Sequence, residues 1–287
     1  MSTPIAYADR YSNLQVELAS GTSVTVNVHQ YRLGAPKAAK DRLWSALKEY
    51  FQKQQKLDPG FRLRLRVNGG SYEFSSYMQM PNWIVRPFTG KGSPECCQVV
   101  LQLAVLLGEA TPQSLQTYCD TNLGLDCNGF VGNFLYYEDS GHNWMDEPRN
   151  GNGGPNDDMT VFAQMGPPVT DTYKMSATNT YLCIETLGGV VIPGGKAGVG
   201  HIAITEPNKF MPQSFVFDSF ASADLGLAQK GAYGHHAFMA VESTGGLGLT
   251  QSWYAFPKSS NPQGIYRVFR GSKGIWLQFK IVDLGNL

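Results

Sequence analysis

The segment Asp-Cys-Asn-Gly-Phe-Val at 126–131 places a cysteine where a loop gives way to an apolar run. Apolar residues continue at helical spacing through Tyr137, so we predict that a helix begins at Cys127. The unpaired backbone N–H groups and the dipole at such a helix end favour a thiolate and can stabilise an oxyanion. We therefore interpret Cys127 as a nucleophile for acyl transfer. Its own N–H would contribute to the oxyanion hole, and Gly129 would keep the approach to the sulfur open.

A histidine could accept the thiol proton, and two segments further along the chain offer one. Residues 198–204 place His201 at the start of an apolar strand, directly after a glycine-rich turn. Residues 235–242 place His236 at the start of a second apolar strand. We take His201 as the base because of its glycine-rich turn, and His236 stays open as the alternative.

A third polar group would orient the histidine ring and stabilise its charge. The strand expected after His201 carries Asp218, and adjacent antiparallel strands would bring the two side chains together. Glu206 and Glu242 stand near the ends of the two histidine strands, and we expect both to be solvated. The sequence thus predicts a triad of Cys127, His201 and Asp218.

The other four cysteines are expected to pack in the core, and they are Cys96, Cys97, Cys119 and Cys183. A total of five is odd and sparse, which is not typical of a disulfide framework. No Cys-x-x-Cys or His-x-x-x-His spacing indicates a metal site. Hydrolysis through a cysteine needs neither a metal ion nor an organic cofactor, so we expect neither.

The elements that must position these residues change character along the chain. Helices are expected in the first half, over residues 36–56, 94–108, 111–122 and 127–137. From about residue 180, short apolar strands alternate with turns rich in Gly, Pro, Asn and Ser. The segment 139–158, rich in Asp, Asn and Gly, is predicted to be a mobile loop. The pattern predicts an α+β fold with helices packed against an antiparallel sheet or an open barrel.

We divide the chain into an N-terminal region, 1–90, and a catalytic region, 91–287. Within the first region, residues 13–31 are predicted to form strands. Three arginines, at 62, 64 and 66, alternate with apolar residues before the turn Asn68-Gly69, a pattern that predicts a hairpin. We expect the arginine face to be solvated, and the region is a candidate for recognising a protein partner.

Together the cysteine and histidine segments resemble the NlpC/P60 and CHAP group of papain-like cysteine hydrolases, over residues 94–285. That family has Asp-Cys-x-Gly-Phe-Val at a helix start, then a Gly-His strand, then a strand with a third polar residue. The chain matches it with DCNGFV at 126–131, GHIAI at 200–204 and VFDS at 216–219, although Asn128 stands where the family commonly has Ser. The resemblance implies a papain-like fold that hydrolyses amide bonds, usually in peptidoglycan peptides.

Bulk properties exclude several other classes. Apolar residues make up 42% and charged residues 16%, as in a folded chain. The 23 basic and 23 acidic residues balance, which argues against a nucleic-acid binder. No segment is apolar over a length that would span a membrane, and the N-terminus lacks the pattern of a secretory signal. We expect a cytoplasmic protein, or one exported by a route that needs no signal.

The sequence therefore predicts a cysteine amidase or peptidase whose first substrate candidate is a cell-wall peptide. Because peptidoglycan lies outside the cytoplasm, the enzyme would be delivered as an antibacterial effector, released by phage lysis, or directed at a cytoplasmic substrate. Two alternatives remain. One is a non-catalytic binding module on a papain-like scaffold, and the other is an acyltransferase or lipid hydrolase of the same fold.

Overall fold

The computed structural model describes residues 2–34, 37–193, 200–211 and 235–287. The predicted strand at 214–217 and Asp218 lie outside the described residues, as does most of the glycine-rich turn before His201. What the sequence indicates about them stays a prediction.

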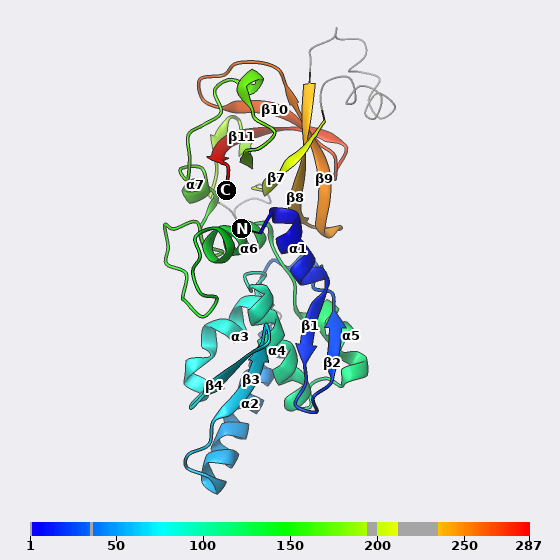
Figure 1. Ribbon diagram of the computed structural model, residues 1–287, viewed down its shortest axis with the longest axis vertical. Helices are drawn as coiled ribbons and strands as arrows, with labels where there is room; N and C mark the ends of the chain where they lie inside the picture. Colours follow the sequence, from blue (N-terminus) through cyan, green and yellow to red (C-terminus); the bar gives the residue numbers. More distant parts are fainter. Residues whose placement is uncertain (1, 35–36, 194–199, 212–234) are drawn as a thin grey trace.

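Six antiparallel strands close into a barrel at one end of the molecule (Figure 1). They are β5 (Thr180–Leu187), β7 (Ile202–Met211), β8 (His235–Thr244), β9 (Gly248–Pro257), β10 (Ile265–Arg270) and β11 (Ile275–Gly285). Their order is β11-β10-β9-β8-β7-β5, and the pairing of β11 with β5 closes the barrel. A short strand, β6 (Val190–Val191), extends the sheet beyond β5. The predicted antiparallel strands that fall within the described residues are confirmed, and the barrel is closed where the sequence suggested a sheet or an open barrel.

Inward-facing side chains fill the barrel, as the alternation of strand residues requires. The buried cluster inside it is largely aromatic and includes Tyr181, Phe238, Tyr254, Phe256 and Phe279. Phe238 meets Tyr181 and Phe256 edge to face, with ring centroids 5.3 and 5.7 Å apart. The barrel interior is thus closely packed, and a charged side chain inside it would have a fixed position.

The described helices lie outside the barrel. They are α1 (Pro4–Ser12), α2 (Lys37–Leu57), α3 (Pro81–Phe88), α4 (Pro94–Leu106), α5 (Leu115–Asn122), α6 (Cys127–Asn133) and α7 (Met159–Phe162). Single 3₁₀ turns occur at Tyr77–Gln79, Pro112–Ser114 and Thr172–Lys174, and a π-helical segment, Phe134–Asp139, continues α6. Two hairpins complete the fold: β1 (Leu14–Glu17) with β2 (Ser23–Val26), and β3 (Leu63–Val67) with β4 (Gly70–Phe74). Figure 1 shows these hairpins and α2–α5 at the end away from the barrel, with α1 and α6 between.

Long periodic elements agree with the sequence-based expectations. The helices predicted over 36–56, 94–108 and 111–122 and the arginine hairpin are confirmed within a few residues. α6 is shorter than predicted, because regular α-helical geometry ends at Asn133 and π-helical geometry follows. α1 was not predicted, although Thr3 caps it by accepting a hydrogen bond from Ala6 N at 3.3 Å and Pro4 opens its first turn.

One buried core continues from the first helix to the barrel. Tyr7 and Tyr11 of α1 pack against Phe130 of α6, with ring centroids 6.0 and 6.4 Å apart. On the barrel side, Glu206 of β7 accepts a hydrogen bond from Ile5 N at 2.7 Å. Glu206 is therefore buried, whereas the sequence led us to expect it in solvent. The division into regions 1–90 and 91–287 stays a prediction.

Replacing Phe130 by alanine tests this shared core. Because Phe130 is 0% exposed and joins α1 to α6, we expect Phe130→Ala to lower the free energy of unfolding by about 3–5 kcal/mol. The measurement is urea denaturation followed by circular dichroism. Leu57→Ala is the control, since Leu57 is 76% exposed and its loss should change stability by less than about 0.5 kcal/mol. Equal effects of the two changes would contradict the packing described.

Candidate active site

Cys127 is the first residue of α6, as the sequence predicts. Asp126 caps the helix by accepting a hydrogen bond from Gly129 N at 2.6 Å, and its other oxygen lies 2.8 Å from Lys91 Nζ. Every residue of α6 is buried, and the helix packs against β7 and β8. The cap thus fixes the cysteine at the boundary between a buried helix and the barrel wall.

Gly129 allows α6 to approach a neighbouring loop closely. A Cβ at this position would lie 1.8 Å from Gly90 O, which also accepts a hydrogen bond from Asp126 N at 3.0 Å. Any side chain here would push the helix away from the loop. Gly129 therefore determines how closely α6 packs against the loop that contains Gly90. This role differs from the predicted one, which was to keep the approach to the sulfur open.

Cys127 lines a pocket with a volume of about 360 Å³. Asn128, Tyr31, Lys91 and Asp157 are among the residues that line it. Asp157 belongs to the segment that we predicted as a mobile loop, yet it is 5% exposed. It accepts hydrogen bonds from Gly151 N at 2.8 Å and Gly154 N at 3.0 Å, while Asn128 Nδ2 donates to Asp157 O at 2.8 Å. The loop is thereby tied to the start of α6.

His201 lies next to α6, just before β7. The backbone N–H of the following residue, Ile202, is close enough to hydrogen-bond with the Cys127 sulfur. His201 Nε2 lies 2.6 Å from Oε2 of Glu242 on β8. Ile204 pairs with Val241, so alternation along the two strands turns His201 and Glu242 to the same face. No hydrogen bond joins the Cys127 thiol to the His201 ring within the described ranges.

Glu242 is the centre of a buried polar cluster. Its side chain is 0% exposed and accepts hydrogen bonds from Ser252 Oγ at 2.8 Å and Tyr254 OH at 3.0 Å. Arg270, which is 1% exposed, donates to Glu242 Oε2 through Nε at 2.9 Å and through a terminal nitrogen at 2.5 Å. The expectation that Glu242 is solvated is therefore wrong, because Arg270 compensates its charge inside the barrel.

The alternative base, His236, is not part of this cluster. His236 stands six positions before Glu242 on β8, which is about 20 Å along a strand. Its ring packs against Phe210 and Phe238, with centroid distances of 5.7 Å to each. Asp218 lies outside the described residues. Of the two candidate bases, His201 is thus the one followed by backbone that lies against Cys127, and its ring contacts Glu242. The role predicted for Asp218 stays a prediction.

The protonation of Cys127 differs from the sequence-based expectation of a thiolate. Burial and the neighbouring Asp126 carboxylate raise the pKa of Cys127 to about 11. The Ile202 N–H, Lys91 and the Asn128 N–H act in the opposite direction but are weaker. Burial and the charge of Asp126 therefore outweigh these stabilising contacts. The resting cysteine is a thiol.

His201 is also neutral at rest. Burial lowers its pKa, and Arg270 and Lys273 act in the same direction, against the opposing effect of Glu242. Burial alone would raise the pKa of Glu242, but the hydrogen bond from His201 and the charge of Arg270 hold it well below its usual range. A neutral imidazole fixed by a carboxylate is the form that can accept a proton from a thiol.

Glu242 and Arg270 are the residues that sequence reasoning missed. Each stands at the end of an apolar strand pattern, and a charge in such a run requires a buried partner. That signal was readable, but the pairing of residues 28 positions apart depends on the barrel register. Within the described part of the chain, no group of three or more His, Cys, Asp or Glu residues could hold a metal ion. Nor does that part contain a helix with the length and apolarity needed to cross a bilayer.

Comparisons with family models, with curated proteins and with solved structures found no match for this chain. The assignment of the site therefore depends on its geometry and on the sequence motifs.

Alkylation as a function of pH tests the state of Cys127. We expect its reaction with iodoacetamide to accelerate up to about pH 11, because the thiolate forms only there. Asp126→Asn should speed the reaction at pH 8, since asparagine still caps the helix but carries no charge. Lys91→Met should slow it. A rate that already levels off near pH 6 would contradict a resting thiol, and peptide mass spectrometry separates Cys127 from the other cysteines.

The lowered pKa of His201 gives stability a pH dependence of defined sign. Below about pH 6.5 the unfolded chain binds a proton on His201, whereas the folded chain binds that proton only at a lower pH. Acid therefore lowers the free energy of unfolding. We expect His201→Gln to flatten this fall between pH 7 and pH 5, measured by urea denaturation. His142→Gln, on a side chain 44% exposed, is the control and should leave the slope unchanged. If the pH dependence of the free energy of unfolding is the same in His201→Gln as in the wild type, the lowered pKa of His201 is wrong.

Proposed function

We propose that this protein is a cysteine hydrolase of papain-like fold that cleaves an amide or peptide bond. Cys127 is the nucleophile, His201 the base, and Glu242 the group that orients His201. The observation that carries the proposal is the placement of a helix-starting cysteine against the start of the strand that follows His201, with His201 Nε2 held 2.6 Å from a buried carboxylate. Since Nε2 lies against Glu242, the proposal assigns the transfer of the thiol proton to Nδ1.

The neutral resting pair defines the order of events. His201 accepts the thiol proton as the Cys127 sulfur attacks the carbonyl carbon, and Glu242 stabilises the imidazolium that forms. The imidazolium then protonates the leaving amine as the carbon–nitrogen bond breaks, which leaves a thioester on Cys127. Water attacks the thioester with His201 again as base, and the acid product leaves the thiol restored.

Two donors are available to the oxyanion. One is the Cys127 backbone N–H at the start of α6, which lacks an intrahelical acceptor. The other is the Tyr31 hydroxyl, since Tyr31 lines the same pocket. Burial and the neighbouring Cys127 and Asp126 side chains raise the pKa of Tyr31 to about 12, so the hydroxyl keeps its proton at neutral pH and can donate a hydrogen bond. Tyr31 lies in the first 90 residues, which therefore contribute to the pocket.

The proposed substrate class is a cell-wall peptide, and this choice rests on the resemblance of DCNGFV and GHIAI to the NlpC/P60 and CHAP pattern. A second candidate function has its own support. The raised pKa of Cys127 favours a binding module in which the thiol never ionises. Transfer of an acyl group to an acceptor other than water would give the acyltransferase alternative.

Muropeptides with a defined stem peptide provide the activity test, with new amino groups identified by mass spectrometry. We expect Cys127→Ala to abolish cleavage and His201→Ala to reduce kcat by about 10²–10⁴. Glu242→Gln should reduce kcat and shift its acid limb, since the imidazolium loses a compensating charge. The matched controls are Cys119→Ala and His142→Ala, which remove a cysteine and a histidine from outside the pocket.

Cleavage that survives Cys127→Ala would overturn the proposal. A folded wild type that binds muropeptides without cleaving them would instead establish the binding module. A product in which the acyl group has moved to an added amine would assign a transferase.

A further inference from the structure

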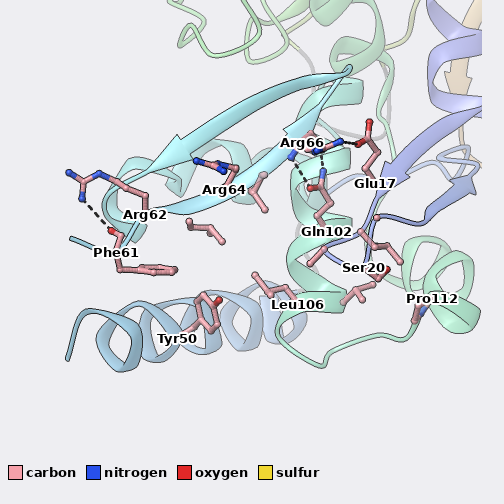
Figure 2. A pocket seen from close by; sticks show the side chains of 16 residues that line it. Glu17, Ser20, Tyr50, Phe61, Arg62, Arg64, Arg66, Gln102, Leu106 and Pro112 are labelled. Carbon is pink, nitrogen blue, oxygen red and sulfur yellow. Dashed lines mark hydrogen bonds and ion pairs between the residues drawn. The ribbon is translucent and has the colours of Figure 1, made fainter. Parts of the chain in front are cut away.

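A second pocket, separate from that of Cys127, lies beside the free edge of β3. It has a volume of about 650 Å³ and shares no lining residue with the Cys127 pocket. The whole of Arg62–Arg66 lines it, facing parts of α2, α4 and the turn after β1 (Figure 2). Two features of this edge indicate what kind of ligand would fit.

The first feature is an amide that imitates a neighbouring strand. The side chain of Gln102 on α4 accepts a hydrogen bond from Arg66 N at 3.1 Å and donates one to Arg66 O at 2.5 Å (Figure 2). Both backbone groups of Arg66 therefore point away from β4. Gln102 satisfies them at one end of the pocket, and the rest of the strand, from Arg62 to Leu65, also lines the pocket.

The pairing of β3 with β4 indicates that the backbone groups of Arg64 and Arg62 also point away from β4. Asn68 and Gly69 form a two-residue turn with positive φ values of 49° and 74°, so Val67 and Gly70 are the closing hydrogen-bonded pair. Alternation along an antiparallel pair then directs the N–H and C=O of Arg64 to the same side as those of Arg66. Arg62, the residue before β3, continues that side. Among the described strands only β4 pairs with β3, so this edge directs backbone groups toward the pocket.

The second feature is the division of the pocket into a charged rim and an apolar floor. The arginine side chains are exposed, and Arg64 and Arg66 pair at the surface with Glu73 and Glu17. Within the described residues, Arg62 has no carboxylate partner. The apolar floor is formed by Leu18, Tyr50, Phe61, Val105, Leu106 and Pro112. Charged side chains on an edge strand can serve simply to prevent aggregation. That role does not explain why an apolar pocket lies beside the strand.

We propose that this pocket binds an extended peptide segment of a partner protein, which adds a strand to the free edge of β3. Successive side chains of an added strand point to opposite faces. Those on the arginine face carry carboxylates, and those between them are apolar and lie on the floor of the pocket. Backbone hydrogen bonds supply affinity and the alternation supplies specificity, as in other cases of strand addition. The site does not depend on the chemistry of Cys127.

The probe is a fluorescein-labelled octapeptide of alternating glutamate and valine, measured by fluorescence anisotropy with the full-length protein. We expect saturable binding that is weakened at least about 10-fold when lysine replaces glutamate. N-methylation of one alternate set of amides should weaken binding at least about 10-fold, whereas methylation of the other set should not, because only one set faces β3. Equal effects of the two methylated peptides would overturn strand addition.

Variants of the protein locate the site. Arg64→Pro removes one outward N–H and leaves the ladder to β4 intact, so it should weaken binding about 10-fold. Ser71→Pro is its matched control, since Ser71 pairs with Arg66 and turns its N–H away from the pocket. Arg62→Glu should weaken binding, and Arg149→Glu should not, because Arg149 is also exposed but does not line the pocket.

Other occupants give different results. Wild-type protein that sediments as a dimer and becomes monomeric in Arg64→Pro would show that a second copy occupies the edge, and the proposal would fail. Binding of heparin at this pocket with no peptide binding would assign a polyanion and would also overturn it. If Arg64→Pro does not fold, the two methylated peptides still decide the question with wild-type protein.

Discussion

The buried carboxylate of Glu242 constrains the arrangement of the whole barrel end. A fully buried charge without compensation would cost several kcal/mol of folding free energy. The barrel strands must therefore be arranged so that Arg270 on β10 contacts Glu242 on β8. The same oxygen of Glu242 then contacts His201. The position of His201 is thus linked to the way in which the barrel neutralises one acid.

A second constraint comes from small residues around α6. The helix is seated against Gly90 through Gly129, and a Cβ at Gly132 would lie 2.5 Å from Pro155. These contacts hold the helix between the pocket loop and the barrel, while its other side packs on Tyr7 and Tyr11 of α1. The cysteine and the histidine belong to different layers, and close packing of backbone against backbone brings the layers together.

Local features could be predicted from the sequence, and pairings between distant segments could not. The start of α6 was readable because Asp126 is a helix cap followed by an apolar run. The hairpin was readable because Asn68-Gly69 specifies a tight turn. Glu242 was misjudged because one strand does not reveal which residue faces it across a barrel. The thiolate was predicted from helix polarity alone, whereas burial and the adjacent Asp126 decide the pKa of Cys127.

Arg270 also explains why the resting site is neutral. Glu242 without Arg270 would favour a protonated His201, because a lone buried carboxylate stabilises an adjacent imidazolium. With Arg270 in place, Glu242 is already neutralised, and the pKa of His201 falls under the combined effect of burial, Arg270 and Lys273. Glu242 still lies 2.6 Å from the ring. It can therefore orient His201 without favouring the imidazolium, and in the proposed mechanism the neutral ring is then able to accept the thiol proton.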